Sequence, residues 1–170
     1  MRKTLLTLLA SACIVGAFEN PAHSADAIWK QTELWTITGH TDNSTCVAAV
    51  RYPDGISLFV GYDGSMWSFS VFGAPSVQGE TRVALVAFDD GTKGNVTFVG
   101  LGDGLHFAGG MSEQFMRSFA TAGAIYVEGI GSYNLKGSAE ATIETVTCQS
   151  ALSESRVSRA WGQKPTDVGV

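Results

Sequence analysis

The stretch that decides the fold is Ser132-Tyr-Asn-Leu-Lys-Gly-Ser-Ala-Glu-Ala-Thr-Ile-Glu-Thr-Val-Thr-Cys148. It predicts a short strand, a glycine turn and then a helix. Ser138 is suited to cap that helix, because a serine hydroxyl accepts a hydrogen bond from an otherwise unpaired amide of the first turn. Ala139, Ile143 and Val146 recur at helical spacing and predict its apolar face.

Cysteine use around this stretch predicts how the chain is held together. Cys148 lies at the end of the expected helix, and Cys46 lies near the start of the regular structure. An exported chain with two cysteines in an oxidising compartment pairs them, and two buried free thiols are the alternative. A closed loop of about 100 residues is worth roughly 4–5 kcal/mol on the chain-entropy model.

The first 25 residues have the pattern of a secretory signal peptide. Arg2 and Lys3 form a basic start, residues 4–18 are almost wholly apolar, and residues 22–25 offer small side chains for cleavage. Lipidation at Cys13 is the alternative reading of this segment. Because the apolar run is shorter than the roughly 20 residues of a membrane span, we expect a periplasmic or secreted protein that is not membrane-spanning.

Charge and length limit the classes of partner and the number of domains. Loss of residues 1–25 moves the net charge from −5 to −6, and no basic patch is evident. An acidic chain of this kind is a poor match for nucleic acid. The remaining residues suffice for one domain, expected over 26–152 and followed by a flexible tail over 153–170.

Alternating apolar residues and Asp-Gly turns predict an antiparallel, β-rich domain. Residues 26–31 read as a short leader, and 39–44 read as a turn. Ser112 is expected to cap a helix through about Ala122, whose apolar stripe is Phe115, Met116 and Phe119. The expected fold is mainly β with two helices (α+β), an antiparallel β-sandwich or partly open barrel of seven to nine strands with one disulfide. The expected strands are Glu33–Thr38, Thr45–Tyr52, Ile56–Tyr62, Ser65–Phe72, Thr81–Phe88, Asn95–Val99, Leu105–Phe107, Ala124–Glu128 and Tyr133–Leu135.

Candidate metal ligands do not occur in metal-binding patterns. The four Asp-Gly pairs begin at Asp54, Asp63, Asp90 and Asp103, and each occurs where a hairpin turn is needed. A calcium loop requires oxygen ligands at alternating positions with a terminal carboxylate, and that spacing is missing. We therefore expect turn chemistry and no metal and no cofactor.

Catalytic apparatus is not visible in the sequence. Beyond the signal peptide the only histidines are His40 and His106, and neither lies in a His-x-His or His-Glu-x-x-His pattern. We expect His40 in a turn and His106 beside a strand. No Gly-x-Ser-x-Gly elbow is present, so a hydrolase would need a hidden site around His106, assembled in space rather than in sequence.

Several apolar residues are candidates for a binding surface. Trp67 and Phe69 alternate with serines and predict a buried face, which places Phe59, Met66 and Phe72 on an opposite or neighbouring face. An uncovered apolar patch of this kind marks an interaction site, unless one of the two helices covers it.

Two loops, Gly73–Gly79 and Gly100–Gly104, are candidates for inserting into the active site of a partner. The second loop includes Asp103, which we add to the candidate binding residues.

The closing pattern also carries a resemblance. Phe88-Asp89 at a strand end, followed by Tyr133-x-Leu135-x-Gly137-Ser138 and a helix to Cys148, resembles small periplasmic proteins of the invasion-associated locus B type. The resemblance implies an exported, β-rich protein without established catalytic residues, acting in the envelope or in host interaction. The chain departs from the pattern in its first half, where only one cysteine appears.

The expected function is therefore that of an exported, non-enzymatic domain that binds another protein in the bacterial envelope or at the host interface. The first alternative is an inhibitor or immunity protein against a periplasmic hydrolase such as a lysozyme, amidase or protease. The second is a hydrolase with the hidden site around His106.

Overall fold

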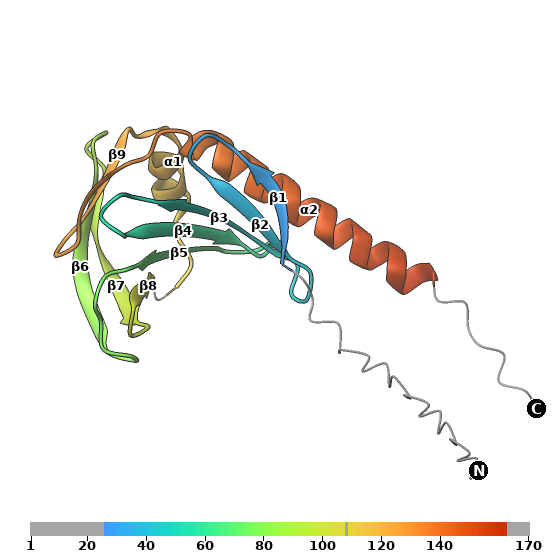
Figure 1. Ribbon diagram of the computed structural model, residues 1–170, viewed down its shortest axis with the longest axis horizontal. Coiled ribbons are helices and arrows are strands. Elements are labelled where there is room, and N and C mark those ends of the chain that lie inside the picture. The colour runs from blue at the N-terminus through green and yellow to red at the C-terminus, as the bar shows by residue number, and fades with distance from the viewer. Residues whose placement is uncertain (1–25, 108, 163–170) are drawn as a thin grey trace, which may run out of the picture.

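The computed structural model describes residues 26–107 and 109–162, with side-chain surroundings through residue 156. The helices are α1 (Glu113–Thr121) and α2 (Ser138–Gly162) (Figure 1). The expected signal peptide and Cys13 lie outside the described residues. The strands are β1 (Ala27–Gln31), β2 (Thr36–His40), β3 (Thr45–Arg51), β4 (Ser57–Tyr62), β5 (Trp67–Phe72), β6 (Thr81–Phe88), β7 (Lys93–Gly100), β8 (Gly104–Phe107), β9 (Ala124–Val127) and β10 (Gly131–Asn134).

The strands form a single ten-stranded sheet in the order β1-β2-β3-β4-β5-β8-β7-β6-β9-β10. Every neighbouring pair is antiparallel. The expected fold class, mainly antiparallel β with two helices and one disulfide, is confirmed.

The structure has ten strands rather than the expected seven to nine. Residues 26–31 were expected to form a leader, but Ala27–Gln31 form strand β1. These side chains are mostly exposed and show no alternation of burial, so the strand is defined by its pairing with β2.

Most strand boundaries differ from the expectation by one to three residues, and β2 and β7 show why. β2 begins at Thr36 and includes His40, so the turn that follows is shorter than expected. β7 begins at Lys93, which makes Gly94 a strand residue paired with Val86. In both places the hydrogen-bonded pairing extends into residues whose composition is typical of turns.

The sheet is strongly curled, and its two edges approach each other without pairing. The Tyr52 hydroxyl, at the β3–β4 turn, donates to the Asn134 carbonyl on edge strand β10, at 2.5 Å. The Trp35 indole donates to the Lys136 carbonyl at 3.0 Å. A partly open barrel therefore describes this single sheet better than a sandwich of two sheets.

Burial at this closure raises the pKa of the Tyr52 phenol to about 12.

Helix α1 lies inside the curl, between the two parts of the sheet (Figure 1). The Ser112 hydroxyl accepts from the Phe115 amide at 3.1 Å, as the capping prediction requires. Met116 and Phe119 are buried, and the Phe119 ring lies edge-on to Trp35 at 5.7 Å. The expected stripe is confirmed, and full burial of a ring of this size stabilises the fold by about 1.5–3 kcal/mol.

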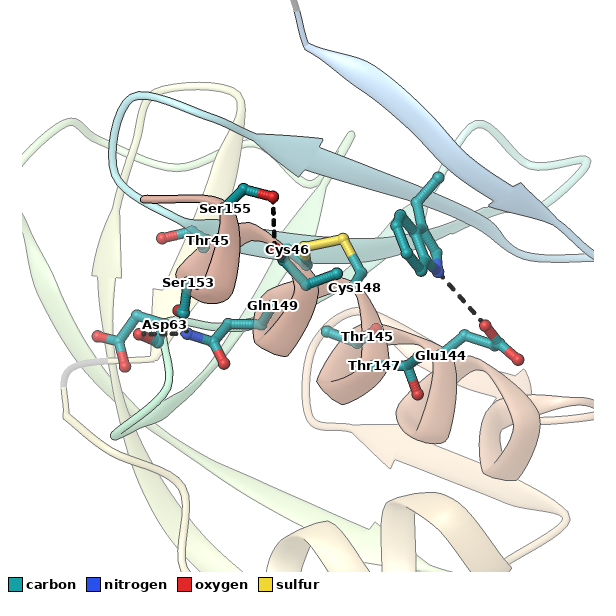
Figure 2. The surroundings of a disulfide bond; sticks show 12 residues. Thr45, Cys46, Asp63, Glu144, Thr145, Thr147, Cys148, Gln149, Ser153 and Ser155 are labelled. Carbon is teal, nitrogen blue, oxygen red and sulfur yellow. Dashed lines mark hydrogen bonds between the residues drawn. A yellow bond between two sulfur atoms is a disulfide. The ribbon is translucent and has the colours of Figure 1, made fainter. Parts of the chain in front are cut away.

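Helix α2 packs across β2, β3 and β4 and is bonded covalently to β3. Cys46 and Cys148 form the predicted disulfide, with their Cα atoms 6.1 Å apart (Figure 2). Both residues are fully buried. Free thiols, the alternative, are excluded by this geometry.

The predicted apolar face of α2 is wrong. Ile143 and Val146 are 64% and 39% exposed, whereas Ala141, Thr145 and Cys148 are fully buried. The small Ala141 allows a close approach to the sheet. The Thr145 hydroxyl donates to the carbonyl of Ala141 at 2.8 Å, so its burial leaves no polar atom unpaired.

Gln149, on the next turn of α2, is a second polar side chain that is buried with its polar group hydrogen-bonded. Its amide nitrogen donates to the Asp63 carbonyl at 3.3 Å and to the Ser153 hydroxyl at 2.8 Å, which allows this polar side chain to be buried (Figure 2).

Helix α2 is also longer than expected. It runs for 25 residues and begins at Ser138, directly after Gly137, whose φ is 83°. Residues 153–162 are therefore helical, which corrects the expectation of a structureless tail from residue 153. The end of the helix passes beyond the sheet in Figure 1. Residues 163–170 lie outside the described part of the chain.

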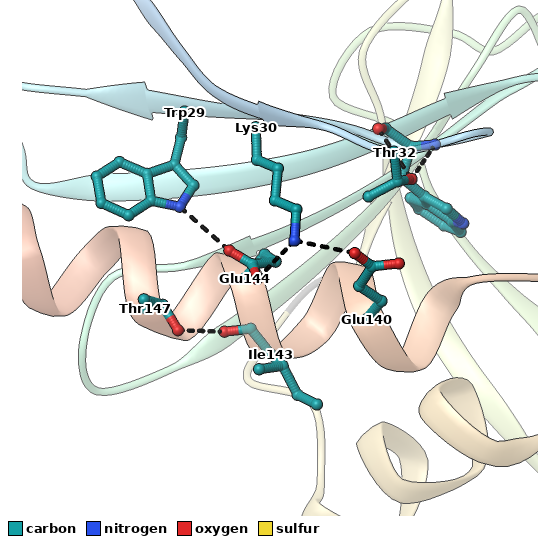
Figure 3. Close-up of polar contacts among 8 residues, drawn as sticks. Trp29, Lys30, Thr32, Glu140, Ile143, Glu144 and Thr147 are labelled. Carbon is teal, nitrogen blue, oxygen red and sulfur yellow. Dashed lines mark hydrogen bonds and ion pairs between the residues drawn. The ribbon is translucent and has the colours of Figure 1, made fainter.

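Strand β1 is attached to α2 by polar contacts (Figure 3). The Lys30 ammonium lies 2.9 Å from Glu140 and 2.8 Å from Glu144, and the Trp29 indole donates to Glu144 at 3.4 Å. Hydrogen bonds to Glu144 and then to Glu140 raise the pKa of Lys30. The hydrogen bond from Lys30 lowers the pKa of Glu144. Because these groups are solvent-exposed, we expect the contacts to fix position more than to add stability.

Candidate functional site

The sheet has an inner face, which both helices cover, and an outer face without a helix over it. The pairing registers align one residue from each of eight strands on the outer face. We call this line of side chains the outer row. None of them is charged. The outer row consists of Gln31, Thr36, Ala49, Phe59, Ser70, His106, Val99 and Thr81.

Phe59 and Phe72 form the aromatic centre of the outer face. Their rings lie edge-on with centroids 5.0 Å apart, and both side chains are partly exposed. Phe69 and Val71 alternate with Phe72 along β5 and are fully buried on the inner face. The structure therefore places these two predicted binding residues together, opposite the core.

Met66 and Asp103 lie at opposite ends of β5. Met66 is 57% exposed and lines a surface hollow of about 290 Å³ with Ser68 and His106. Asp103 is exposed in the β7–β8 turn, and its carbonyl accepts from the Gly73 amide at 2.8 Å. Asp103 is next to the Phe72 end of the outer face, whereas Met66 belongs to the other end.

His106 pairs with Ser70 across the β5–β8 ladder. The Ser70 hydroxyl and the His106 Nδ1 are 2.8 Å apart. In the part of the chain that the structure describes, no carboxylate is hydrogen-bonded to His106, so the third member of a triad is not in place. The arrangement acts as a cross-strand contact within the outer row, and the hydrolase hypothesis stays a prediction.

The two loops predicted as candidates for insertion form one unit, which we call the double loop (Gly73–Gly79 with Gly100–Gly104). Gly79 donates to the Gly100 carbonyl at 2.8 Å, and Gly73 donates to the Asp103 carbonyl. The Ser76 hydroxyl bridges the loops: it accepts from the Gly102 amide at 3.1 Å and donates to the Gly104 carbonyl at 2.6 Å.

Close backbone contact also fixes the double loop. A Cβ at Gly100 would lie 2.1 Å from the Val77 carbonyl oxygen, so only glycine fits there. Val77 and Leu101 are 65% and 40% exposed, and Val77 borders a hollow of about 380 Å³. Each loop could be recognised by its glycines, but their pairing joins segments more than twenty residues apart and has no sequence signal.

The Asp-Gly positions behave mainly as turns. Asp54, Asp63 and Asp90 each accept a hydrogen bond from a backbone amide two residues on. At Asp63, hydrogen bonds from the backbone amides of Met66 and then Ser65 lower the pKa of the carboxyl group. The fourth pair differs, because the positive φ belongs to Gly102 and Gly104 is a strand residue.

Metal ligands do not gather elsewhere either. Within residues 26–107 and 109–156, no group of three His, Cys, Asp or Glu side chains is arranged to hold a metal ion. His40 is the last residue of β2 rather than a turn residue, and its Nδ1 lies 2.6 Å from an Asp26 carboxylate oxygen.

Comparisons with protein-family models, with curated proteins and with solved structures find no match for this chain. Across the described residues, no helix has both the length and the apolar character needed to cross a membrane. Inference about function therefore rests on the geometry of the outer face and the double loop.

Proposed function

We propose that this chain is an exported, non-enzymatic domain that binds another protein through the outer face of its sheet, in the bacterial envelope or at the host interface. Export is supported by the signal-like residues 1–25 and by the Cys46–Cys148 disulfide, which is typical of oxidising compartments. The resemblance to proteins of the invasion-associated locus B type is consistent with this role.

The outer row is the observation that carries the proposal. A row of eight uncharged residues with an aromatic pair beside its centre has the composition of an interface core, from which charged residues are depleted. With neighbouring strands about 4.8 Å apart, the row is about 34 Å long when measured along the curve of the sheet. A standard interface of roughly 800 Å² per partner would cover the part of the row around Phe59 and Phe72.

Capture of the partner tests this proposal. The mature, oxidised protein is incubated with periplasmic and culture fractions at about 0.5 M salt, where exposed charge contacts are screened. Bound proteins are then identified by mass spectrometry. We expect the wild type to retain one stoichiometric partner, and Phe59→Ser/Phe72→Ser to lose it because the aromatic centre is removed.

A matched control tests whether loss of the partner is specific to the outer face or follows the loss of any exposed apolar side chain. Ile143→Ser removes an exposed apolar side chain from α2, on the other side of the molecule from the outer face. This variant should retain the partner. If both variants retained it, with unchanged thermal unfolding, binding through the outer face would be refuted.

The double loop supports a second candidate, an inhibitor or immunity protein against a periplasmic lysozyme, amidase or protease. A loop held by backbone hydrogen bonds needs little ordering on binding, which favours affinity. Its exposed Val77 and Leu101 could enter a substrate cleft.

Inhibition assays distinguish this candidate from the outer-face proposal. Val77→Asp should abolish inhibition of a captured hydrolase, whereas Phe59→Ser/Phe72→Ser should leave it intact. The opposite pattern would assign the hydrolase to the outer face, and no inhibition by the wild type would exclude the inhibitor role.

A further inference from the structure

We infer that the unpaired edge of β7 binds an extended peptide segment of a partner, which adds a short strand to the sheet. Strand β8 pairs with residues 98–100 of β7, and within the described residues no strand pairs with residues 93–97 on that side. Figure 1 shows β8 beside only one end of β7. An unpaired edge of this kind is a template for a further strand. The site is separate from the outer face and from the double loop.

The hydrogen bonds of β7 show which of its backbone groups are free. The Gly100 amide donates to the Glu80 carbonyl at 2.8 Å, on the side of β6. Because antiparallel ladders alternate, the even-numbered residues of β7 bond to β6, and the odd-numbered residues direct their N–H and C=O groups away from it. Among the described residues, Lys93 and Asn95 have no backbone partner on that side. Each therefore offers a donor and an acceptor to a peptide.

The loop after β8 leaves this edge open because it crosses to β5. The Met111 amide donates to the Trp67 carbonyl at 3.1 Å, and a Cβ built at Gly110 would lie 3.1 Å from the Met66 sulfur. A pocket of about 420 Å³ lies between β7, this loop and the start of α1, and we call it the β7 slot. Residues 93–97 span about 14 Å, so the slot is long enough for four or five residues of extended chain.

The inner side of the β7 slot suits an apolar side chain. Gly94 pairs with Val86, which is buried on the inner face, and a Cβ built at Gly94 would meet no atom within 4 Å. Phe107 and Phe115 line the same pocket, are only partly buried, and have ring centroids 6.2 Å apart. Because side chains alternate along a strand, one apolar side chain of the peptide would lie over Gly94, beside these rings.

The β6–β7 turn sets the charge that suits one end of the peptide. Asp90 is two residues before Thr92, which lines the slot, and the Thr92 amide donates to its carboxylate at 2.7 Å. Within the described residues, neither Asp89 nor Asp90 forms an ion pair. The Lys93 side chain does not compensate these charges in the slot, because it alternates with Gly94 onto the outer face. A lysine or arginine at this end of the peptide is therefore favoured.

Hydrogen exchange of the free protein tests whether the edge is unpaired. After correction for local sequence, the Asn95 amide should exchange at least about tenfold faster than the Val96 amide, which bonds to β6. Equal protection of the two amides would overturn the proposal before any ligand is added.

A phage library of random seven-residue peptides is the probe for binding, selected on the mature, oxidised protein. We expect the enriched peptides to alternate apolar and polar residues and to carry lysine or arginine at one end. The best synthetic peptide should slow exchange of the Asn95 amide. Methylation of its alternate backbone nitrogens should weaken binding by roughly tenfold or more, because the donors that bond to the edge are lost.

Asn95→Pro is the decisive variant. It removes the amide directed into the slot and leaves the bonds to β6, so the fold should be retained and peptide binding weakened by roughly tenfold or more. Asn95→Val is the matched control, because it changes the side chain and keeps the amide, and it should bind as the wild type does. Gly94→Val fills the inner side of the slot and serves if the proline variant does not unfold cooperatively.

The charge preference and the location are tested separately. Asp90→Asn keeps an acceptor for the Thr92 amide and should weaken binding of the basic peptide by about threefold, the scale of an exposed ion pair. Unchanged affinity would refute the basic preference. Phe59→Ser/Phe72→Ser should leave peptide binding intact, whatever its effect on the partner of the outer face.

Several outcomes would overturn the proposal. They are failure of the library to enrich peptides on the wild type over Asn95→Pro, equal binding of the methylated peptide, and slowed exchange confined to β4 and β5. The last result would assign the peptide to the outer face.

Discussion

Strand β5 shows how differently the two faces of one sheet are built. Phe69 and Val71 point inward and are fully buried beneath the helices, whereas Ser70 and Phe72 alternate with them and remain partly exposed. The inner face gains its stability from buried apolar area, and the outer face carries aromatic rings beyond what its packing requires. Exposed aromatic rings beside uncharged neighbours are typical of surfaces that bind a partner.

The largest expected difference in stability between the two faces comes from removing one aromatic ring from each. Phe69→Ala should lower the free energy of unfolding by about 3–5 kcal/mol, because it leaves a cavity in the core. Phe72→Ala, three residues along β5 and on the opposite face, should lower the free energy of unfolding by less than about 1 kcal/mol. Urea unfolding measures both. Similar losses from the two variants would show that the outer face is as tightly packed as the core.

The covalent link between the inner face and α2 ranks next. Cys46→Ala/Cys148→Ala should lower the free energy of unfolding by about 2–4 kcal/mol, because the disulfide constrains a long loop in the unfolded chain. A loss of that size lowers the melting temperature by several degrees. Reduction of the wild-type protein provides the control. An unchanged melting temperature would mean that α2 is held by its packing alone.

The two helices show which parts of the fold the sequence can predict. In α1 the predicted stripe is Phe115, Met116 and Phe119, of which Met116 and Phe119 are buried and Phe115 is partly buried against the core, so the spacing of large apolar residues identifies the inner face directly. In α2 the buried positions include Thr145 and Gln149, whose polar groups are hydrogen-bonded within the helix or to β4–β5 turn residues. Hydrophobic spacing therefore selected the wrong face, because Ile143 and Val146 are exposed while polar residues are buried.

The candidate sites were predictable to different degrees for the same physical reason. Alternation along β5 predicted that Phe72 lies on the face opposite Phe69, because side chains alternate with a period of two. That Phe59 of β4 lies on the same face as Phe72 follows from the register of the two strands, which the structure supplies. The joining of Gly73–Gly79 to Gly100–Gly104, and the Ser70–His106 contact, depend on strand order. Sequence period carries no information on which strands become neighbours, so these features required the structure.

The ion pair between β1 and α2, at the exposed edge of the inner face, should have the smallest effect on stability. Lys30 lowers the pKa of Glu144 in the folded state, so the contribution of Glu144 to folding stability is fully present above the ordinary carboxyl pKa of about 4.3. It is lost as the pH falls through the lowered value. The raised pKa of Lys30 means that its contribution is lost only in strong base, above the ordinary value of about 10.4.

Lys30→Met should therefore lower the melting temperature slightly between about pH 5 and pH 10, with the gap to the wild type narrowing in acid. Lys93→Met, which removes a lysine that has no ion pair within the described residues, should show no such pH dependence. A gap for Lys30→Met that stayed constant into acid would show that the ion pair with Glu144 does not attach β1 to α2, because methionine keeps an apolar side chain of similar length and removes only the charge.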